Sequence, residues 1–211
     1  MKNKIITIDG PAGSGKARIS KYISKKWGFY HLDSGVLYRR LGRIILNYNV
    51  DLNNYKQINH FLKKIKILSP RNSKVIRSEN ISIIASKIAT IKKIREFINI
   101  QQKIIIKREL KNRGCVVDGR DIGSVVFKNA DIKMYVKVDE KIRAKRRHKQ
   151  LIDIGEKSIY AKILKEIKLR DKVDKSRKNS PLIIPRGAYV IDNSSSFTNT
   201  INQIKTIFQI K

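Results

Sequence analysis

Short apolar runs separated by amphipathic segments organise this chain. Four runs rich in β-branched residues predict buried strands at 5–8, 115–117, 132–138 and 189–192. Elsewhere apolar residues recur every three or four positions, which predicts helices at 17–27, from about 34 onward, at 83–89, 91–110, from 140 onward, at about 159–177 and at 197–210. Strands that alternate with helices in this way predict a mainly parallel sheet with right-handed crossovers.

The pattern changes between residues 51 and 83. A helix-periodic segment ends near Ile65, and two short strand-like runs follow at 65–68 and 74–77. The turn signal Ser69-Pro70-Arg71-Asn72-Ser73 separates these two runs. We therefore expect a small inserted αβ unit here, within a chain of 211 residues that otherwise fits one domain.

The strongly basic composition admits two interpretations. Lys and Arg number 48 against 17 acidic residues, a formal net charge of +31. Such an excess attracts phosphate polymers, as in nucleic-acid-binding proteins. The lysines are spread along the whole chain, however, without an RNA- or DNA-binding motif. We favour solvated lysine-rich faces and expect no specific nucleic-acid partner.

Cysteine usage and hydropathy indicate the cellular compartment of the protein. A single cysteine, Cys115, excludes an intramolecular disulfide and fits a reducing compartment. The apolar stretch at the N-terminus stops at Asp9, which is too short for a signal peptide. Lys or Arg interrupts the other apolar runs before membrane-spanning length. We expect a cytoplasmic protein with no membrane partner.

The first predicted strand leads into a glycine-rich turn and a lysine. The stretch fits the G-x-x-x-x-G-K part of the phosphate-binding P-loop and reads Gly10-Pro11-Ala12-Gly13-Ser14-Gly15-Lys16. Glycine permits backbone conformations that a Cβ would penalise, so successive N–H groups can point at phosphate oxygens. The start of the next helix and Lys16 both add positive charge. Strand, turn, lysine and helix in this order predict a nucleotide phosphate site.

The residues after Lys16 depart from the P-loop pattern. A P-loop normally continues with Ser or Thr, whose hydroxyl ligates Mg²⁺. Here Ala17 and Arg18 follow the lysine, and neither side chain can serve as that ligand. The sequence predicts a phosphate cradle without its usual metal-binding hydroxyl.

Polar groups also gather at the ends of two other predicted elements. Asp33 or Ser34 can cap the second helix, on which Tyr38 stands four residues after Ser34 and Arg39 lies beside it. The sequence Asp118-Gly119-Arg120-Asp121 follows the strand at 115–117, at the edge where parallel sheets bind ligands.

Two helices in the C-terminal half each place arginines on one face. The positions are Arg143, Arg146 and Arg147 in the first helix and Arg170, Asp174 and Arg177 in the second. An arginine face without acidic neighbours at i+4 is either solvated or built for polyphosphate.

Taken together, these motifs resemble the bacterial cytidylate (CMP/dCMP) kinases of the nucleoside monophosphate (NMP) kinase fold. The resemblance runs essentially end to end and rests on IDGPAGSGK, LDSGVLYR, ASKIAT…IRE, VVDGRDIG, RAKRRHKQL and RDKVDKSR. It implies an α/β, three-layer P-loop NTPase fold with a parallel five-stranded sheet. It further implies a core at 1–50 and 84–211, an inserted NMP-binding subdomain at 51–83 and a helical lid at about 140–180.

The resemblance also implies a reaction and the residues that carry it. Such enzymes move the γ-phosphoryl of Mg²⁺-bound ATP to CMP or dCMP, and a monomer is expected. ATP would be bound by residues 10–18 together with Arg143, Arg146 and Arg147. CMP would be bound by Ser34, Tyr38, Arg39, Ser86, Arg95, Arg120, Asp121, Arg170 and Asp174. Lys16, Arg120, Arg170 and Arg177 would act in catalysis, and Asp33 and Asp118 would meet Mg²⁺ through water.

Several alternatives stay open at this level. The missing hydroxyl is compatible with reduced activity in which phosphates and water hold Mg²⁺, with compensation by Ser14 or Ser20, or with a nucleotide-binding homologue of impaired catalysis. Another small P-loop kinase and a non-catalytic nucleic-acid-binding protein are rival classes. We favour an active but slowed cytidylate kinase, because all the expected acceptor-side and arginine positions are present.

Overall fold

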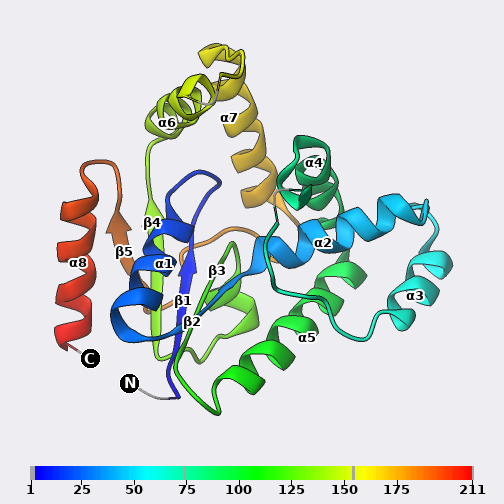
Figure 1. The fold of residues 1–211 in the computed structure, drawn as a ribbon, viewed down its shortest axis with the longest axis horizontal. Helices are drawn as coiled ribbons and strands as arrows, with labels where there is room; N and C mark the ends of the chain where they lie inside the picture. Colours follow the sequence, from blue (N-terminus) through cyan, green and yellow to red (C-terminus); the bar gives the residue numbers. More distant parts are fainter. Residues whose placement is uncertain (1–2, 74, 154, 211) are drawn as a thin grey trace.

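Five short strands form one parallel sheet in the order β2-β3-β1-β4-β5. Their bounds are β1 Ile5–Asp9, β2 Tyr30–Asp33, β3 Cys115–Gly119, β4 Ile132–Lys137 and β5 Tyr189–Asp192. The structure, a computed structural model, describes residues 3–73, 75–153 and 155–210 (Figure 1). Strand β1 lies at the centre, paired with β3 on one side and β4 on the other. All the strands run in the same direction, so their carboxyl ends meet at one edge of the sheet.

Helices cover both faces of the sheet and divide the core in two. Helices α1 (Lys16–Trp27) and α8 (Phe197–Ile210) pack on one face with Val116 of β3. The other face, with Cys115 and Val117 of β3, is covered by α2 (Ser34–Asn47), α3 (Tyr55–Lys64) and α5 (Lys92–Glu109). Because alternate residues of a strand point to opposite faces, a strand buried on both sides is apolar throughout. The predicted three-layer α/β fold with a parallel five-stranded sheet is confirmed.

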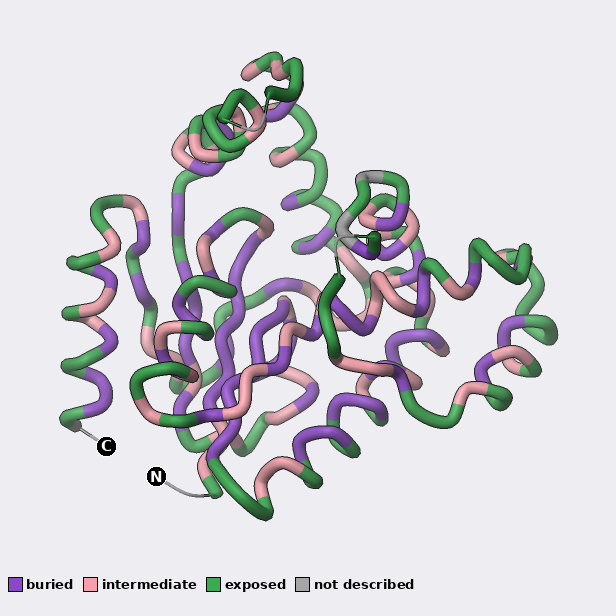
Figure 2. Tube along the Cα trace, in the orientation of Figure 1, coloured by how far each residue is buried: buried purple, intermediate pink, exposed green. Residues whose placement is uncertain are grey.

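Two further helices stand above the carboxyl edge of the sheet. They are α6 (Glu140–Asp153) and α7 (Tyr160–Ser176), which lie at the top of Figure 1 above the P-loop. Figure 2 shows that exposed positions dominate their outer turns, whereas buried positions run through the strands. In the described part of the chain, no helix is long and apolar enough to cross a membrane.

Three local predictions were wrong or incomplete. Strand β2 was missed because its four residues include His31 and Asp33 and form no apolar run. The runs at 65–68 and 74–77 are not strands: the first has no strand pairing, and Val75–Arg77 forms a 3-10 turn that precedes α4 (Glu79–Ile88). Lys74 lies outside the described residues. Asp33 does occupy the cap position of α2 but makes no side-chain capping hydrogen bond.

A glutamine side chain takes the place of a neighbouring strand at 65–68. Gln101 of α5 accepts from the Leu68 N–H through Oε1 at 2.9 Å and donates from Nε2 to the Lys66 carbonyl at 3.2 Å. Buried backbone groups need partners, and a side-chain amide can supply both a donor and an acceptor. The segment is therefore held against α5 without belonging to a sheet.

Candidate active site

The P-loop connects β1 to α1 at the carboxyl edge of the sheet. Gly13 and Gly15 have φ of 72° and 90°, in the left-handed region that disfavours side chains. A Cβ at Gly15 would lie 2.2 Å from Asn193 Nδ2, so the position also lacks room for one. The loop turns directly into α1, whose first residue is Lys16. The backbone geometry is that of a phosphate cradle at a helix N-terminus.

Lys16 is buried against this loop with neutral partners. Its ammonium donates to the Pro11 carbonyl at 2.7 Å and to Ser14 Oγ at 3.3 Å. Burial lowers the pKa of Lys16 well below its usual value, and the nearby charge of Arg120 lowers it further. A phosphate oxygen would supply the opposite charge that this ammonium lacks.

Asp9, the last residue of β1, anchors the neighbouring turn. Its two carboxylate oxygens accept from the backbone N–H groups of Ile122 and Gly123 at 2.8 and 2.7 Å. Burial raises the pKa of Asp9 to about 6, although the two backbone hydrogen bonds oppose the shift. Asp9 thus ties the P-loop strand to the segment that follows Arg120 and Asp121. The sequence analysis gave Asp9 no role, although an aspartate that ends an apolar strand is a usable signal.

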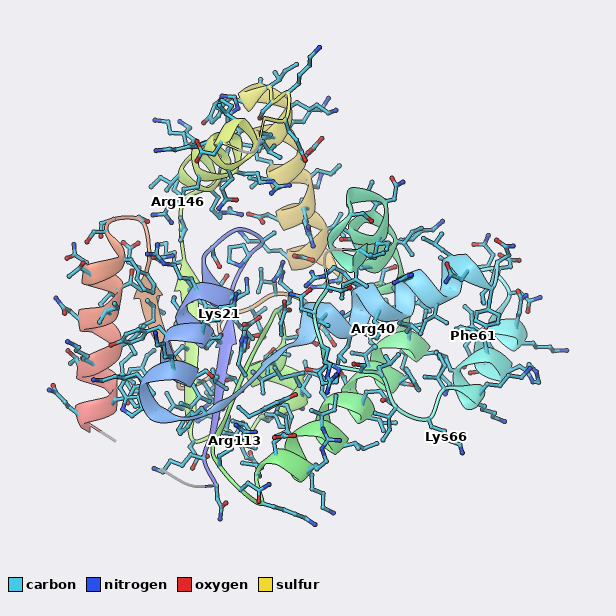
Figure 3. The ribbon with its side chains drawn as sticks, in the orientation of Figure 1. Lys21, Arg40, Phe61, Lys66, Arg113 and Arg146 are labelled. Atoms are coloured by element: carbon cyan, nitrogen blue, oxygen red, sulfur yellow. The ribbon has the colours of Figure 1, made fainter. Side chains whose placement is uncertain are left out.

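Asn193, at the start of the loop between β5 and α8, supports the P-loop from behind. Its Nδ2 donates to the Ser14 carbonyl at 2.8 Å, and its Oδ1 accepts from Thr200 Oγ1 at 2.8 Å. Arg146 of α6 in turn donates to the carbonyls of Asn193, Ser194 and Ser195 at 2.8 to 3.2 Å (Figure 3). In the sequence, Asn193 stood in what looked like an ordinary turn, so it was missed. Arg146 was expected at ATP, and here its guanidinium binds this loop.

The two residues in place of the P-loop hydroxyl do not replace its chemistry. The Arg18 guanidinium lies over the Phe197 ring, 3.8 Å from its centroid, which is a cation–π contact between α1 and α8. Ala17 is exposed and offers no polar atom from its side chain. Ser14 and Ser20, the two hydroxyls considered as substitutes, are fully buried.

On the other side of the sheet edge, arginines are paired with carboxylates. Arg95 of α5 forms a buried ion pair with Asp121 and also donates to the Ala89 carbonyl at 2.9 Å. The Arg95 guanidinium lies 5.8 Å from the centroid of the Tyr38 ring, and burial raises the pKa of Tyr38. Arg39 pairs with Asp33 at 3.0 Å. The structure therefore brings these predicted residues of α2, α5 and the segment after β3 to one side of the site.

Asp174 of α7 gathers two more of the predicted arginines. Arg120 Nε donates to Asp174 Oδ2 at 2.9 Å, and Arg177 Nη2 lies 3.2 Å from Asp174 Oδ1. Burial alone would raise the pKa of Asp174, but Arg120 and Arg177 lower it below its usual value. Arg170 is exposed and makes no hydrogen bond or ion pair with the residues that the structure describes, while its charge interacts with those of Arg120 and Asp174.

Several buried donors on this side have no hydrogen-bond partner among the described residues. They are Tyr38 Oη, Arg39 Nε, Arg95 Nε and Arg177 Nη2, the last of which forms an ion pair with Asp174 but is not aligned for a hydrogen bond. Buried polar atoms in folded proteins are nearly always paired, so such a group of unpaired donors indicates a place for a ligand. Donors without matching acceptors suit an anion such as a phosphate monoester.

The remaining predicted residues occupy the margins of the site. Ser34 is buried, and a Cβ at Gly119 would lie 2.5 Å from its Oγ, so the two positions touch. Ser86 is half-buried on α4, and Arg147 is exposed on α6. Within the described residues, neither Ser86 nor Arg147 makes a hydrogen bond or ion pair with the other predicted residues.

The carboxylates at the strand ends bear on metal binding. Asp118 is buried, and its Oδ2 lies 2.7 Å from His31 Nε2, while Asp33 is committed to Arg39. In residues 3–73, 75–153 and 155–210, no cluster of three or more metal-binding side chains occurs. Mg²⁺ accepts a site with few protein ligands because it keeps several waters and binds substrate phosphates. Two carboxylates at neighbouring strand ends are a donor set that suits a metal arriving with the nucleotide.

Comparison with known proteins places the chain in a family. The sequence profile of the family described as cytidylate kinase matches residues 6–209. A cytidylate kinase of Fusobacterium nucleatum is 36% identical over an alignment of 223 positions, gaps included, which covers 100% of both chains. One of Thermosipho africanus is 40% identical over 210 residues, covering 94% of this chain and 91% of the relative. The chain belongs to the cytidylate kinase family.

Among solved structures, one from Thermus thermophilus titled TT1252 shares the fold. It matches with a TM-score of 0.53 at 14% identity and covers 99% of this chain and 98% of that one. For this cytidylate kinase family member, the resemblance drawn from the P-loop and the arginine motifs is confirmed, and so is the expectation of an ATP-dependent nucleotide kinase.

Proposed function

We propose that the chain transfers the γ-phosphoryl of ATP to CMP or dCMP, giving ADP and CDP or dCDP. The observation that carries this proposal is the group of buried donors on Tyr38, Arg39, Arg95 and Arg177 that make no hydrogen bond, across the sheet edge from a P-loop lysine that forms no ion pair within the described residues. One side suits a polyphosphate and the other a monophosphate, as a kinase with two nucleotide substrates requires.

The ATP side acts through the backbone and Lys16. Residues 12–15 offer backbone N–H groups to the β- and γ-phosphates, and Lys16 moves from the Pro11 carbonyl to a phosphate oxygen. Arg147, exposed on α6, is available to the nucleotide, whereas Arg146 shapes this side from the loop after β5. The γ-phosphorus is thereby held facing the acceptor.

The acceptor side acts through exchange of partners. Arg39, Arg120 and Arg177 leave or share their carboxylates to bind the phosphate of CMP, and Arg170 joins them without losing a partner among the described residues. Phosphoryl transfer needs little covalent chemistry from the protein, so positioning and charge stabilisation account for most of the catalysis. Arg177 is the group that we place closest to the transferring phosphoryl.

We assign base selection to the pair of Arg95 and Asp121, together with Ser86 of α4 as the resemblance implies. Cytosine presents an amino donor and a carbonyl acceptor, which a carboxylate and a guanidinium match. Uracil lacks the amino donor and would leave buried Asp121 with an unpaired oxygen, so UMP should be the poorer substrate.

Mg²⁺ is the cofactor of this proposal, with Asp33 and Asp118 as its water-mediated contacts. When bound, the metal neutralises phosphate charge during transfer. Because Ala17 and Arg18 lack the usual hydroxyl, and Arg18 is held on Phe197, we propose that turnover is real but slowed. A nucleotide-binding homologue with impaired catalysis is the second candidate, favoured by the same observation.

The proposal also retains the predicted layout. Residues 51–83 form the NMP-binding subdomain, residues of about 140–180 form the lid, and the rest forms the core of a monomeric cytoplasmic enzyme. Limited proteolysis tests the boundaries of the subdomain and the lid, and sedimentation tests whether the enzyme is a monomer.

The test is a coupled assay with CMP, dCMP, UMP, dTMP and AMP as acceptors and with Mg²⁺ varied. We expect CMP and dCMP to be phosphorylated best. We also expect the activity to keep rising with Mg²⁺ beyond the concentration that converts all the ATP to Mg²⁺-bound ATP. Clear preference for AMP or dTMP would refute the substrate. Tight binding of ATP and CMP without turnover at any Mg²⁺ concentration would establish the second candidate.

A further inference from the structure

Arg143 lies where α6 meets the P-loop, and all three nitrogens of its guanidinium donate hydrogen bonds. Its Nη1 donates to the Ala12 carbonyl and to Asp171 Oδ1, both at 3.0 Å, and its Nη2 donates to Asp171 Oδ2 at 2.5 Å. Its Nε donates to the Val138 carbonyl at 3.1 Å, and the residue is only 3% exposed. Four of its five N–H donors are thus engaged within the described residues, which leaves one N–H on Nη2, and direct binding of ATP phosphates by Arg143 stays a prediction. The same guanidinium instead joins the P-loop, the end of β4 and α7.

The partner of Arg143 on α7 stands among the acceptor-side residues. Asp171 directly follows Arg170, and Asp174 lies nearly one turn further along the same helix. Asp174 in turn holds Arg120 and Arg177. The position of α7 relative to Ala12 therefore sets the position of this arginine group relative to the P-loop.

The Arg143–Asp171 ion pair can fix the orientation of α7 relative to α6 and the P-loop. A planar guanidinium that binds both oxygens of one carboxylate allows little rotation, unlike an ammonium. Asp171 is 8% exposed, so solvent and salt screen the interaction little. Arg143 also donates to the Ala12 carbonyl, so a shift of the P-loop backbone would displace the Arg143 guanidinium that binds Asp171.

We propose that Arg143 and Asp171 are positioning residues that couple the P-loop to the acceptor-binding part of α7. A nucleoside triphosphate on the P-loop fixes the Ala12 carbonyl, which holds Arg143, Asp171 and α7 in one arrangement. The monophosphate then binds to a site that is already ordered, so each nucleotide strengthens the binding of the other. This inference rests on the proposed function and assigns both residues a role without substrate contact.

The same two helices offer a matched control. Lys168 of α7 and Glu140 of α6 also form an ion pair across the helices, at 3.7 Å, with side chains 55% and 41% exposed. Each member of this pair lies three residues before a member of the buried pair, and in the part of the chain that the structure describes neither forms a hydrogen bond or ion pair with the P-loop. Glu140→Gln therefore removes a link between α6 and α7 without touching the coupling.

The experiment measures the dissociation constant of CMP by calorimetry, with and without a non-hydrolysable ATP analogue. In the wild type we expect the analogue to tighten CMP binding by about fivefold or more, the lower end of typical coupling. Asp171→Asn and Arg143→Lys should bring this ratio close to one while CMP alone still binds, and Glu140→Gln should keep the wild-type ratio. Lysine keeps the charge at position 143 but cannot bind Ala12 and both Asp171 oxygens at once, so it serves if Asp171→Asn does not fold.

The outcomes separate the coupling from the function. A ratio of one in the wild type, or an unchanged ratio in both variants, would overturn the coupling even though CMP is bound and phosphorylated. A wild-type chain that binds ATP but neither binds nor phosphorylates CMP would refute the proposed function, and the coupling with it. A variant that had merely lost stability would bind both nucleotides more weakly and would melt at a lower temperature. Glu140→Gln shows how far the melting temperature falls when an ion pair between α6 and α7 is lost without the coupling.

Discussion

The ATP side and the acceptor side of the site are held together by different forces. On the ATP side, backbone groups and neutral or single charged side chains support the P-loop: Asn193 binds the Ser14 carbonyl, Asp9 binds two N–H groups, and Lys16 donates to a carbonyl. On the acceptor side, arginine–carboxylate pairs dominate, with Arg95 on Asp121 and Arg120 on Asp174.

This difference indicates which side must reorganise. A cradle made of backbone N–H groups is close to its bound geometry before the ligand arrives, and a bound triphosphate restricts the motion that remains. Arginines that are paired with carboxylates keep the buried charge neutral until a phosphate replaces or joins the carboxylate. We infer that the ATP side is preorganised and that the acceptor side changes its pairing during the catalytic cycle.

The largest expected effect comes from removing Arg177, which we propose lies nearest the transferring phosphoryl. Arg177→Ala should lower kcat by about 10³-fold or more, since an arginine that stabilises the transition state of phosphoryl transfer contributes about 10³ to 10⁵. KM values should change much less, because the contact strengthens mainly in the transition state. Steady-state kinetics with CMP and ATP measure both quantities.

A surface ion pair provides the control for this prediction. Arg113 pairs with Glu109 at 3.2 Å, and its side chain is 52% exposed (Figure 3). Arg113→Ala should leave kcat unchanged, because exposed pairs contribute little. Turnover that survives Arg177→Ala would show that the acceptor side does not work through this arginine.

Much of the fold and of the site was predictable from sequence, and what could not be predicted has a physical reason. The P-loop, the strands at 5–8, 115–117 and 132–138 and the arginine faces follow from local spacing, because glycine, β-branched residues and helical periodicity act over a few residues. Asp9 and Asn193 escaped prediction because their partners lie far along the chain, at Gly123 and Ser14.

Long-range pairing also explains the error in the insert and the unequal contacts of the lid arginines. The run at 65–68 has strand-like composition, but Gln101, 33 residues away from Leu68, satisfies its backbone. Arg143, Arg146 and Arg147 were treated as equivalent because they share a helix face. Their contacts divide them: one is bound to Asp171, one to the loop after β5, and one is exposed.

A smaller effect tests the preorganised side through Asp9. Asp9→Asn keeps one acceptor for the N–H groups of Ile122 and Gly123 and loses the other, which should reduce the free energy of unfolding by about 1–3 kcal/mol. The pKa of Asp9 is raised from 3.8 to about 6. The native state therefore binds this proton more tightly than the unfolded chain, and the contribution of Asp9 to stability falls as pH rises through that window.

Urea denaturation at several pH values between 4 and 7 measures this difference. The stability gap between wild type and Asp9→Asn should be widest near pH 4 and narrow as pH approaches 7. Asp192 ends β5 and has its pKa lowered by hydrogen bonds from Ser194, so the gap for Asp192→Asn should instead narrow as pH falls. A gap for Asp9→Asn that widens with rising pH would show that its carboxylate is stabilised in the fold.

The smallest effect concerns the hydroxyl that the P-loop lacks. Ala17→Ser adds it without disturbing the contact between Arg18 and Phe197, whereas Arg18→Thr also removes that contact, which is worth about 0.5–1 kcal/mol at an exposed site. One added hydrogen bond or ligand of about 1 kcal/mol should reduce the Mg²⁺ concentration for half-maximal activity by about fivefold. Ala161→Ser on an exposed turn of α7 should leave that concentration unchanged. If Ala17→Ser gives no shift, the phosphates, water, Asp33 and Asp118 already hold the metal adequately, and the ATP side is complete without the hydroxyl.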